Sequence, residues 1–258
     1  MKIIATICAL DQDRDLQNFQ ATCTGKLELP DGSVVKCTGV HGTVDLTKAI
    51  GRSCNCYMAA LIQELDEDAA RETMRQLGIY PTGEGATATV DKLQRTTSST
   101  HFRSAHIFQD VWALIGQGDS LVNVIDMAMI AGSVVNGGQT AQPYLVESIG
   151  VTDADKLTYQ AKPGEQIHLI DDDTAKLVNQ YWTDAVAKYY GDRVCSTITH
   201  AKTGTAQQGN DQTNRTLMGV MEEYDTAFFL VVEELPAGDK LIFEIANTLA
   251  EIIPAYAE

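Results

Sequence analysis

The stretch that decides the fold is Ala201-Lys202-Thr203-Gly204-Thr205-Ala206. It follows a run rich in Ile, Thr and Val at residues 194–200, so the Lys-Thr-Gly triplet is expected late in a strand. Small residues flank the lysine and let a ligand or another chain approach the backbone closely. A cation, a hydroxyl and an exposed sheet-edge N–H together predict a site that binds carboxylates and carbonyls.

The composition is that of a soluble globular protein, with 44% apolar and 21% charged residues in a chain of 258. The net charge of −16 argues against nucleic acid and against an anionic membrane surface, since both attract basic proteins. No apolar run reaches the roughly 20 residues that span a bilayer. Residues 1–10 are apolar, but they lead into Asp11-Gln12-Asp13-Arg14 without a small-residue cleavage site. We therefore expect a buried helix there rather than a signal peptide.

Hydrophobic periodicity predicts one domain with a helical part at about 1–140 and a sheet-and-helix part at about 141–258. Residues 81–105 are rich in Thr, Ser and Gly without periodicity, which predicts a long loop. Helices are expected over 2–17, 45–52, 57–62, 66–77, 124–135, 174–190 and 239–253. Strands are expected near 194–206, 214–222 and 226–234.

The cysteines are too scattered for a disulfide-dense mini-domain. Two of them, Cys23 and Cys37, flank a predicted hairpin that turns at Pro30-Asp31-Gly32, and His41 follows closely. A disulfide, a metal site and two plain thiols all remain open for this pair, and plain thiols are the simplest. A Cys/Cys/His metal site would need a fourth ligand that the sequence does not identify, so no metal and no cofactor is predicted.

A second motif, Ser53-Cys54-Asn55, lies between two expected helices, 149 residues before Lys202. Ser-x-Asn by itself is equally typical of a helix cap. Its surroundings are more specific, with His-Gly-Thr-Val-Asp-Leu at residues 41–46 before it and an aromatic residue after it. This segment, followed later by Lys-Thr-Gly, closely resembles the transpeptidase domains of penicillin-binding proteins.

The resemblance covers nearly the whole chain in the same order and is strongest to the class B enzymes. Further similar stretches are Trp-Ala-Leu-Ile-Gly-Gln-Gly at 112–118, Val-Asn-Gly-Gly at 135–138 and Pro-Tyr-Leu-Val at 143–146. It implies an α/β (α+β) fold of the β-lactamase/transpeptidase type, with an antiparallel sheet flanked by helices and an all-helical subdomain.

The family's third motif, Ser-x-x-Lys, opens a buried helix about 50 residues before Ser-x-Asn. Lys2 lies 51 residues before Ser53 and begins the expected apolar helix, so it resembles the lysine of that motif. The serine would then fall two positions ahead of Met1, and the sheet strands that precede it in the family would be missing as well. The resemblance therefore implies a fragment, truncated at its N-terminus, that lacks the nucleophile.

The resemblance also implies catalytic roles. Lys2 would be the general base and Lys202 a second cation. Ser53 would relay a proton to the leaving amine, while Asn55 would orient Lys2 and bind a substrate amide.

The remaining site residues would bind substrate. Thr203 and Thr205 would hold the terminal carboxylate together with the lysine of their motif, Gly204 would bind substrate in the same triplet, and the N–H of Thr205 would contribute to the oxyanion hole. Gln117 either lines the cleft or only braces its loop.

The implied function is D,D-transpeptidation of peptidoglycan, with D-Ala-D-Ala stem peptides and β-lactams as partners, although this chain is expected to be inactive without the serine. Two alternatives remain: a non-catalytic peptidoglycan-binding module, and a relative of β-lactamases or β-lactam sensors. The parent protein would be anchored outside the cytoplasmic membrane, whereas this chain shows neither signal nor anchor. An exposed sheet edge left by the missing strands would favour a homo-oligomer.

Overall fold

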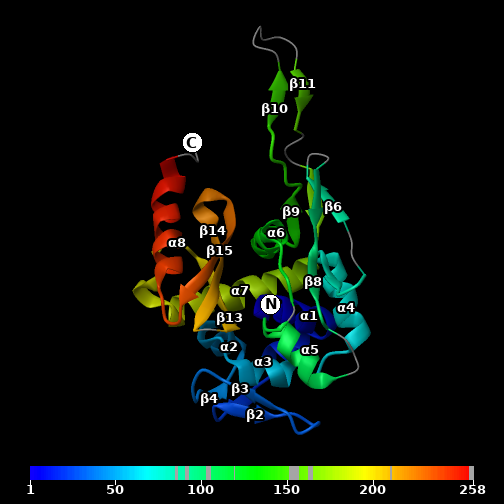
Figure 1. Ribbon diagram of the computed structural model, residues 1–258, viewed down its shortest axis with the longest axis vertical. Coiled ribbons are helices and arrows are strands. Elements are labelled where there is room, and N and C mark those ends of the chain that lie inside the picture. Colours follow the sequence, from blue (N-terminus) through cyan, green and yellow to red (C-terminus); the bar gives the residue numbers. More distant parts are fainter. Residues whose placement is uncertain are drawn as a thin grey trace.

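The computed structural model describes residues 1–84, 87–90, 93–102, 106–118, 120–150, 157–161, 165–209 and 211–255 (Figure 1). Its helices are α1 (Lys2–Gln12), α2 (Leu46–Arg52), α3 (Asn55–Ile62), α4 (Glu67–Gln76), α5 (Ile107–Leu114), α6 (Val124–Val135), α7 (Asp172–Tyr189) and α8 (Leu241–Ile252). Its strands are β1 (Ala21–Cys23), β2 (Lys26–Glu28), β3 (Val34–Lys36), β4 (Gly42–Val44), β5 (Ile79–Pro81), β6 (Thr87–Val90), β7 (Leu93–Thr96), β8 (Ser98–Thr100), β9 (Gln139–Ala141), β10 (Ser148–Gly150), β11 (Leu157–Gln160), β12 (Gln166–His168), β13 (His200–Gly209), β14 (Gln212–Met221) and β15 (Thr226–Pro236).

Helix α1 runs through the middle of the hydrophobic core, as its all-round apolar sequence predicts. Every residue from Ile3 to Leu10 is buried, and the helix packs against α4 and α7. It ends at Gln12 rather than at 17, because Asp13 is extended and its carboxylate caps a separate short 3-10 turn by accepting a hydrogen bond from the N–H of Asp15. A central helix of this kind fixes whatever lies at its first residue.

Strands β13, β14 and β15 form an antiparallel sheet in that order, and the Lys-Thr-Gly strand β13 is at its edge. Helix α8 packs on one side of this sheet and α6 on the other (Figure 1). Gly204 lies opposite Thr216, and a Cβ at this glycine would come within 2.3 Å of the threonine Oγ1. The glycine of the triplet therefore allows close cross-strand packing. Strand β13 begins at His200, later than expected, because a turn closed by the Ile198 N–H and the Cys195 carbonyl comes first.

The prediction of a long loop over 81–105 is wrong for the part of that segment that the structure describes. It contains β6 and β7, which form a hairpin, and β8, which pairs in parallel with β5. Residues 85–86, 91–92 and 103–105 lie outside the described residues. The segment is held against α6, where the buried Asp126 accepts hydrogen bonds from the N–H and hydroxyl of Ser98 and lies 2.6 Å from Arg95. Threonine-rich sequence suits a strand once such a partner is present.

The predicted hairpin between Cys23 and Cys37 is confirmed as β2 and β3, which turn at Pro30-Asp31-Gly32. With β1 and β4 it lies at one end of the long axis, and the β10–β11 hairpin projects at the other end (Figure 1). The helical part predicted at about 1–140 thus carries further short strands besides the predicted hairpin. None of the described helices is long and apolar enough to span a bilayer.

Candidate active site

One cavity of about 640 Å³ is lined by all the catalytic and substrate-binding residues that the sequence predicts, although the first and last of them lie about two hundred positions apart. The start of α1, the turn between α2 and α3, the loop after α5 and the edge strand β13 all contribute to its wall. The predicted residues that line it are Lys2, Ser53, Asn55, Gln117, Lys202, Thr203, Gly204 and Thr205.

Lys2 lies at the first residue of the buried helix α1. Its Nζ donates a 2.9 Å hydrogen bond to the carbonyl oxygen of Ile115, in the turn that follows α5. Burial strips the ammonium group of water and lowers the pKa of Lys2 from its usual 10.5 to about 8. A lysine of this kind exchanges a proton near neutral pH, which an exposed lysine does not.

Ser53 and Asn55 occupy a sharp turn between two helices. Ser53 ends α2 in a left-handed conformation (φ 52°), and Cys54 caps α3 by accepting a hydrogen bond from the N–H of Tyr57. The Nδ2 of Asn55 donates to the carbonyl oxygen of Lys36 at 2.9 Å, which ties the turn to β3. The side-chain hydrogen bond that the structure gives Asn55 is therefore to the hairpin, and the expected pairing with the lysine of α1 stays a prediction.

Lys202 is the second cation of the cavity and is buried, with only 8% of its surface exposed. Its Nζ donates a 2.8 Å hydrogen bond to the carbonyl oxygen of Thr203. Burial lowers its pKa well below the usual value, and the nearby charges of Lys2 and Arg193 lower it further. The N–H of Thr203 donates to the hydroxyl of Tyr190 at 3.1 Å, so the end of α7 supports this edge strand.

Gln117 lines the cavity and its side chain contacts the neighbouring strand, while the predicted choice between lining a substrate cleft and only bracing its loop stays a prediction. Its Nε2 donates a 3.0 Å hydrogen bond to the carbonyl oxygen of Thr205. The hydroxyl of Thr205 accepts a 2.8 Å hydrogen bond from Arg215, which lies directly opposite on β14. Sequence reasoning missed Arg215, and the antiparallel register of β13 and β14 was the signal that could have found it.

The geometry of these motifs agrees with a comparison against known families. Residues 1–250 match the family described as the penicillin binding protein transpeptidase domain. The chain belongs to this family. The family and the mixed helix-and-sheet fold predicted from the motifs are thereby confirmed.

Solved structures share the fold of this transpeptidase domain. The D,D-transpeptidase domain of a peptidoglycan glycosyltransferase from Eggerthella lenta is 20% identical, with a TM-score of 0.77, and the match covers 97% of this chain and 64% of that one. Penicillin-binding protein A from Mycobacterium tuberculosis, solved as an imipenem acyl-enzyme complex, is 22% identical with a TM-score of 0.77 over 97% and 58% of the two chains. Penicillin-binding protein 3 of that organism is 18% identical with a TM-score of 0.74, and the match covers 99% of this chain and 61% of that one. The chain thus spans about three fifths of the length of these structures.

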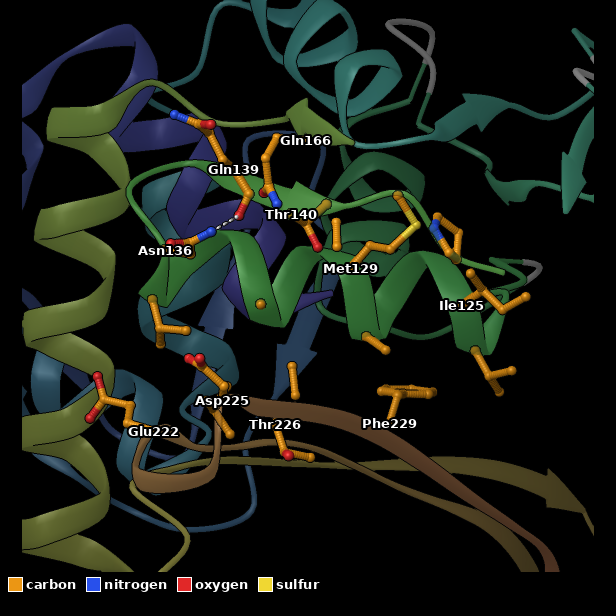
Figure 2. Close-up of a pocket in the computed structure, with 18 residues that line it drawn as sticks. Ile125, Met129, Asn136, Gln139, Thr140, Gln166, Glu222, Asp225, Thr226 and Phe229 are labelled. Atoms are coloured by element: carbon orange, nitrogen blue, oxygen red, sulfur yellow. Dashed lines mark hydrogen bonds between the residues drawn. The ribbon is translucent and has the colours of Figure 1, made fainter. Parts of the chain in front are cut away.

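A larger cavity of about 760 Å³ lies elsewhere in the transpeptidase domain, between α6 and β15 (Figure 2). Ile125 and Met129 of the helix and Phe229 of the strand line it, and Phe229 also lines the motif cavity. No residue of the three motifs lines this cavity, so we do not assign the active site to it, although it is the larger of the two.

A compact group of sulfur and imidazole side chains lies directly behind the Ser53–Asn55 turn. The ligand atoms of Cys23, Cys37, His41 and Cys54 all lie within 4.8 Å of one another. The hairpin pair is not joined as a disulfide in this structure. The fourth side chain that the sequence did not identify is Cys54, the middle residue of the Ser-x-Asn motif.

Proposed function

We propose that the motif cavity is the substrate cleft of a peptidoglycan D,D-transpeptidase that recognises stem peptides ending in D-Ala-D-Ala, and also β-lactams. The observation that carries the proposal is the presence of two lysines with lowered pKa values, the half-buried Lys2 and the buried Lys202, in one cavity with both remaining motif segments. The solved relatives support it, since penicillin-binding protein A of M. tuberculosis was captured as acyl-enzymes with imipenem and penicillin G.

The paired cations give the cleft its affinity for an anionic substrate terminus. Each lysine loses hydration on burial and also repels the other, which is costly until a negative group arrives. A carboxylate next to Lys202 offsets that cost and accepts hydrogen bonds from the hydroxyls of Thr203 and Thr205. A substrate carboxylate is therefore the natural counter-ion of this wall.

Lys2 supplies the proton chemistry. With a pKa of about 8, a fraction of the group is neutral at physiological pH and accepts a proton from a hydroxyl nucleophile. Ser53, on the same cavity, passes a proton to the leaving amine. In the family a serine three residues before this lysine is the nucleophile, and the residues of the motif cavity supply binding and proton transfer around it.

Reversible binding tests the proposal directly. A polypeptide of residues 1–258 is titrated by NMR with an N-acetylated peptide ending in D-Ala-D-Ala and with the same peptide as its C-terminal amide. The acid is expected to bind more tightly than the amide. Lys202→Met is expected to weaken binding of the acid by about 10-fold or more, since a hydrogen bond to a charged group contributes roughly 1.5–3 kcal/mol.

The matched control is Lys188→Met, which removes an exposed lysine from α7 and is expected to change nothing. Equal affinity for acid and amide would overturn the proposed carboxylate recognition.

Labelling with a fluorescent penicillin separates the transpeptidase from its alternatives. The polypeptide of residues 1–258 is expected to form no covalent adduct, whereas the same polypeptide extended by Ser-Ala ahead of Met1 regains the spacing of Ser-x-x-Lys. An adduct at one residue of the unextended polypeptide would contradict this assignment of the nucleophile. Failure of the extended polypeptide to bind penicillin, even reversibly, would favour a non-catalytic peptidoglycan-binding module.

We also propose that the outer edge of β15 pairs with a second copy of the chain. Among the described residues β15 pairs only with β14, and its Val231 is 38% exposed. An unpaired strand edge favours pairing with a further strand. Sedimentation is expected to show a dimer that Val231→Lys weakens, and a monomer at high concentration would overturn this.

A further inference from the structure

We propose that Cys23, Cys37, His41 and Cys54 bind one zinc ion. The Nδ1 of His41 lies 3.6 Å from the sulfur of Cys23 and 3.6 Å from the sulfur of Cys37. The sulfurs of Cys37 and Cys54 are 3.9 Å apart, and all four ligand atoms lie within 4.8 Å of one another. Four zinc-binding atoms from three separate segments of the chain therefore converge on one point.

These separations are those of a tetrahedral zinc site. With Zn–S bonds of about 2.3 Å and Zn–N bonds of about 2.0–2.1 Å, tetrahedral angles place two sulfurs about 3.8 Å apart and a sulfur about 3.5 Å from a nitrogen. A disulfide needs about 2.05 Å between sulfurs, which the Cys37–Cys54 pair does not approach. The side chains thus need little movement to bind an ion of this size.

The backbone holds three of the ligands in place before any metal binds. Cys23 ends β1, and its carbonyl oxygen accepts a hydrogen bond from the N–H of His41, which leads into β4. The N–H of Cys37 donates to the carbonyl oxygen of Gly25, which extends the β2–β3 hairpin by one pair. Antiparallel pairing therefore sets the positions of these ligands, and the fourth comes from the turn before α3.

Backbone N–H groups point at two of the sulfurs and favour the thiolate form that zinc requires. The N–H of Asn55 donates to Cys37 at 3.3 Å, and the N–H of Tyr57 donates to Cys54 at 3.5 Å. The thiol of Cys23 donates to the carbonyl oxygen of Gly39 at 3.4 Å, a weak contact that binding to zinc would replace. Binding of Zn²⁺ by three thiols and one neutral imidazole releases three protons and leaves a site with a net charge of −1.

The donor set selects the metal. Thiolates are soft ligands that exclude Mg²⁺ and Ca²⁺, whereas three sulfurs and one imidazole in a tetrahedron suit Zn²⁺. The site is reached from the motif cavity, because Cys37 is half-buried and lines that cavity, while Cys23 and Cys54 are buried. All four positions of the tetrahedron are filled by protein, which is typical of structural zinc rather than catalytic zinc.

The position of Cys54 implies that the ion would stabilise the Ser53–Asn55 turn. It stands between Ser53 and Asn55, so a zinc ion would fasten this turn to the strands on the other side of the cluster. The hydrogen bond from Asn55 to the carbonyl oxygen of Lys36 joins the same two parts. The ion would therefore hold one wall of the cleft at a fixed distance from the hairpin, which a hydrogen bond alone does more weakly.

The first test uses the unaltered chain. The protein is reduced, stripped of metal with a chelator, reloaded with Zn²⁺ or buffer alone, and alkylated, and each cysteine is quantified by mass spectrometry. Zinc is expected to slow alkylation of Cys37 at least 10-fold and to protect Cys23 and Cys54, while the half-buried Cys195 is unaffected. Equal alkylation of Cys37 with and without zinc would overturn the proposal.

The second test measures stoichiometry and ligand identity. Elemental analysis of the reloaded protein is expected to give one zinc per chain, and Co²⁺ is expected to give the intense visible bands of a tetrahedral cobalt thiolate. Cys37→Ser and Cys54→Ser should weaken zinc binding by about 100-fold or more, whereas the matched controls Cys8→Ser and Cys195→Ser should retain it. Retention of zinc by Cys37→Ser and Cys54→Ser alike would overturn this ligand set. Neither test depends on transpeptidase activity, so the outcome is independent of the proposed function.

Discussion

The amide of Gln117 donates a 3.0 Å hydrogen bond to the carbonyl oxygen of Thr205, and so connects the loop after α5 to the edge of the sheet. Both residues line the motif cavity. Gln117→Ala is expected to weaken binding of a D-Ala-D-Ala peptide about 5-fold, the effect of losing a hydrogen bond of roughly 1 kcal/mol that positions the strand. NMR titration measures it, and Gln139→Ala, outside this cavity, is the control. An unchanged affinity in both variants would show that the brace does not position the substrate strand.

The ion pair between the buried Asp126 and the partly exposed Arg95 predicts a large effect on stability. Asp126 is 3% exposed, and its two carboxylate oxygens are taken by Arg95 and Ser98. Asp126→Asn is expected to cost about 3–5 kcal/mol in the free energy of unfolding, because it leaves the guanidinium without its counter-charge. Urea unfolding measures the loss. The matched control Asp184→Asn breaks an exposed pair with Lys188 and should cost under about 1 kcal/mol; equal losses would contradict the prediction.

His200 makes the stability of the fold dependent on pH. It is fully buried beside Thr183 and Asn179, and burial lowers its pKa from 6.5 to about 4. Between these two values the unfolded chain binds a proton that the folded chain does not, so stability is complete above about pH 6.5 and falls as the pH decreases towards 4. The loss for one such group is on the order of 3 kcal/mol.

The pH effect is measured by urea unfolding at a series of pH values in wild type and in His200→Asn. The variant is expected to be less stable at pH 7 and to lose less of its stability between pH 6.5 and 4.5. The exposed His168 provides the control variant, His168→Asn, which should keep the wild-type slope. Identical slopes in all three proteins would rule out His200 as the titrating group.

Gly219 and Phe228 face each other on β14 and β15, and a Cβ at Gly219 would lie 2.4 Å from the aromatic ring. Gly219→Ala should therefore destabilise the protein by about 1–3 kcal/mol through overpacking. The same substitution in a Phe228→Ala background should cost clearly less, because the ring is gone. Thermal unfolding of the four proteins completes the cycle, and equal costs in both backgrounds would refute a steric cause.

Local chemistry was enough to predict the elements whose ends are marked in the sequence. The helix predicted over 45–52 is α2, and the carboxylate of Asp45 caps it by accepting a hydrogen bond from the N–H of Lys48 at 2.8 Å. The Lys-Thr-Gly strand and the two strands that follow were also predicted, because strand periodicity and turn residues agree there. The motif residues were predicted by resemblance, and the structure brings them to one cavity.

Contacts between distant segments could not be predicted from the sequence. The strands within 81–105 depend on a carboxylate of α6, 28 positions after Ser98, and nothing local reveals it. Nothing in the sequence indicates that Cys54 is a metal ligand, because only the fold brings its sulfur next to the hairpin. Arg215 escaped notice for the same reason, since cross-strand register must be known before its partner on β13 can be named.

The contact between Tyr190 and Thr203 influences the register in which a peptide can pair with the edge of β13. Backbone groups alternate along a strand, so residues 203 and 205 both present their N–H and carbonyl to the open side. Tyr190 occupies the N–H of Thr203, Lys202 occupies its carbonyl, and Gln117 occupies the carbonyl of Thr205. Of the backbone groups of Thr203 and Thr205 on this edge, the N–H of Thr205 is the one that none of these three contacts engages. An incoming peptide that aligns a carbonyl oxygen with this N–H gains a hydrogen bond without displacing any of the three contacts.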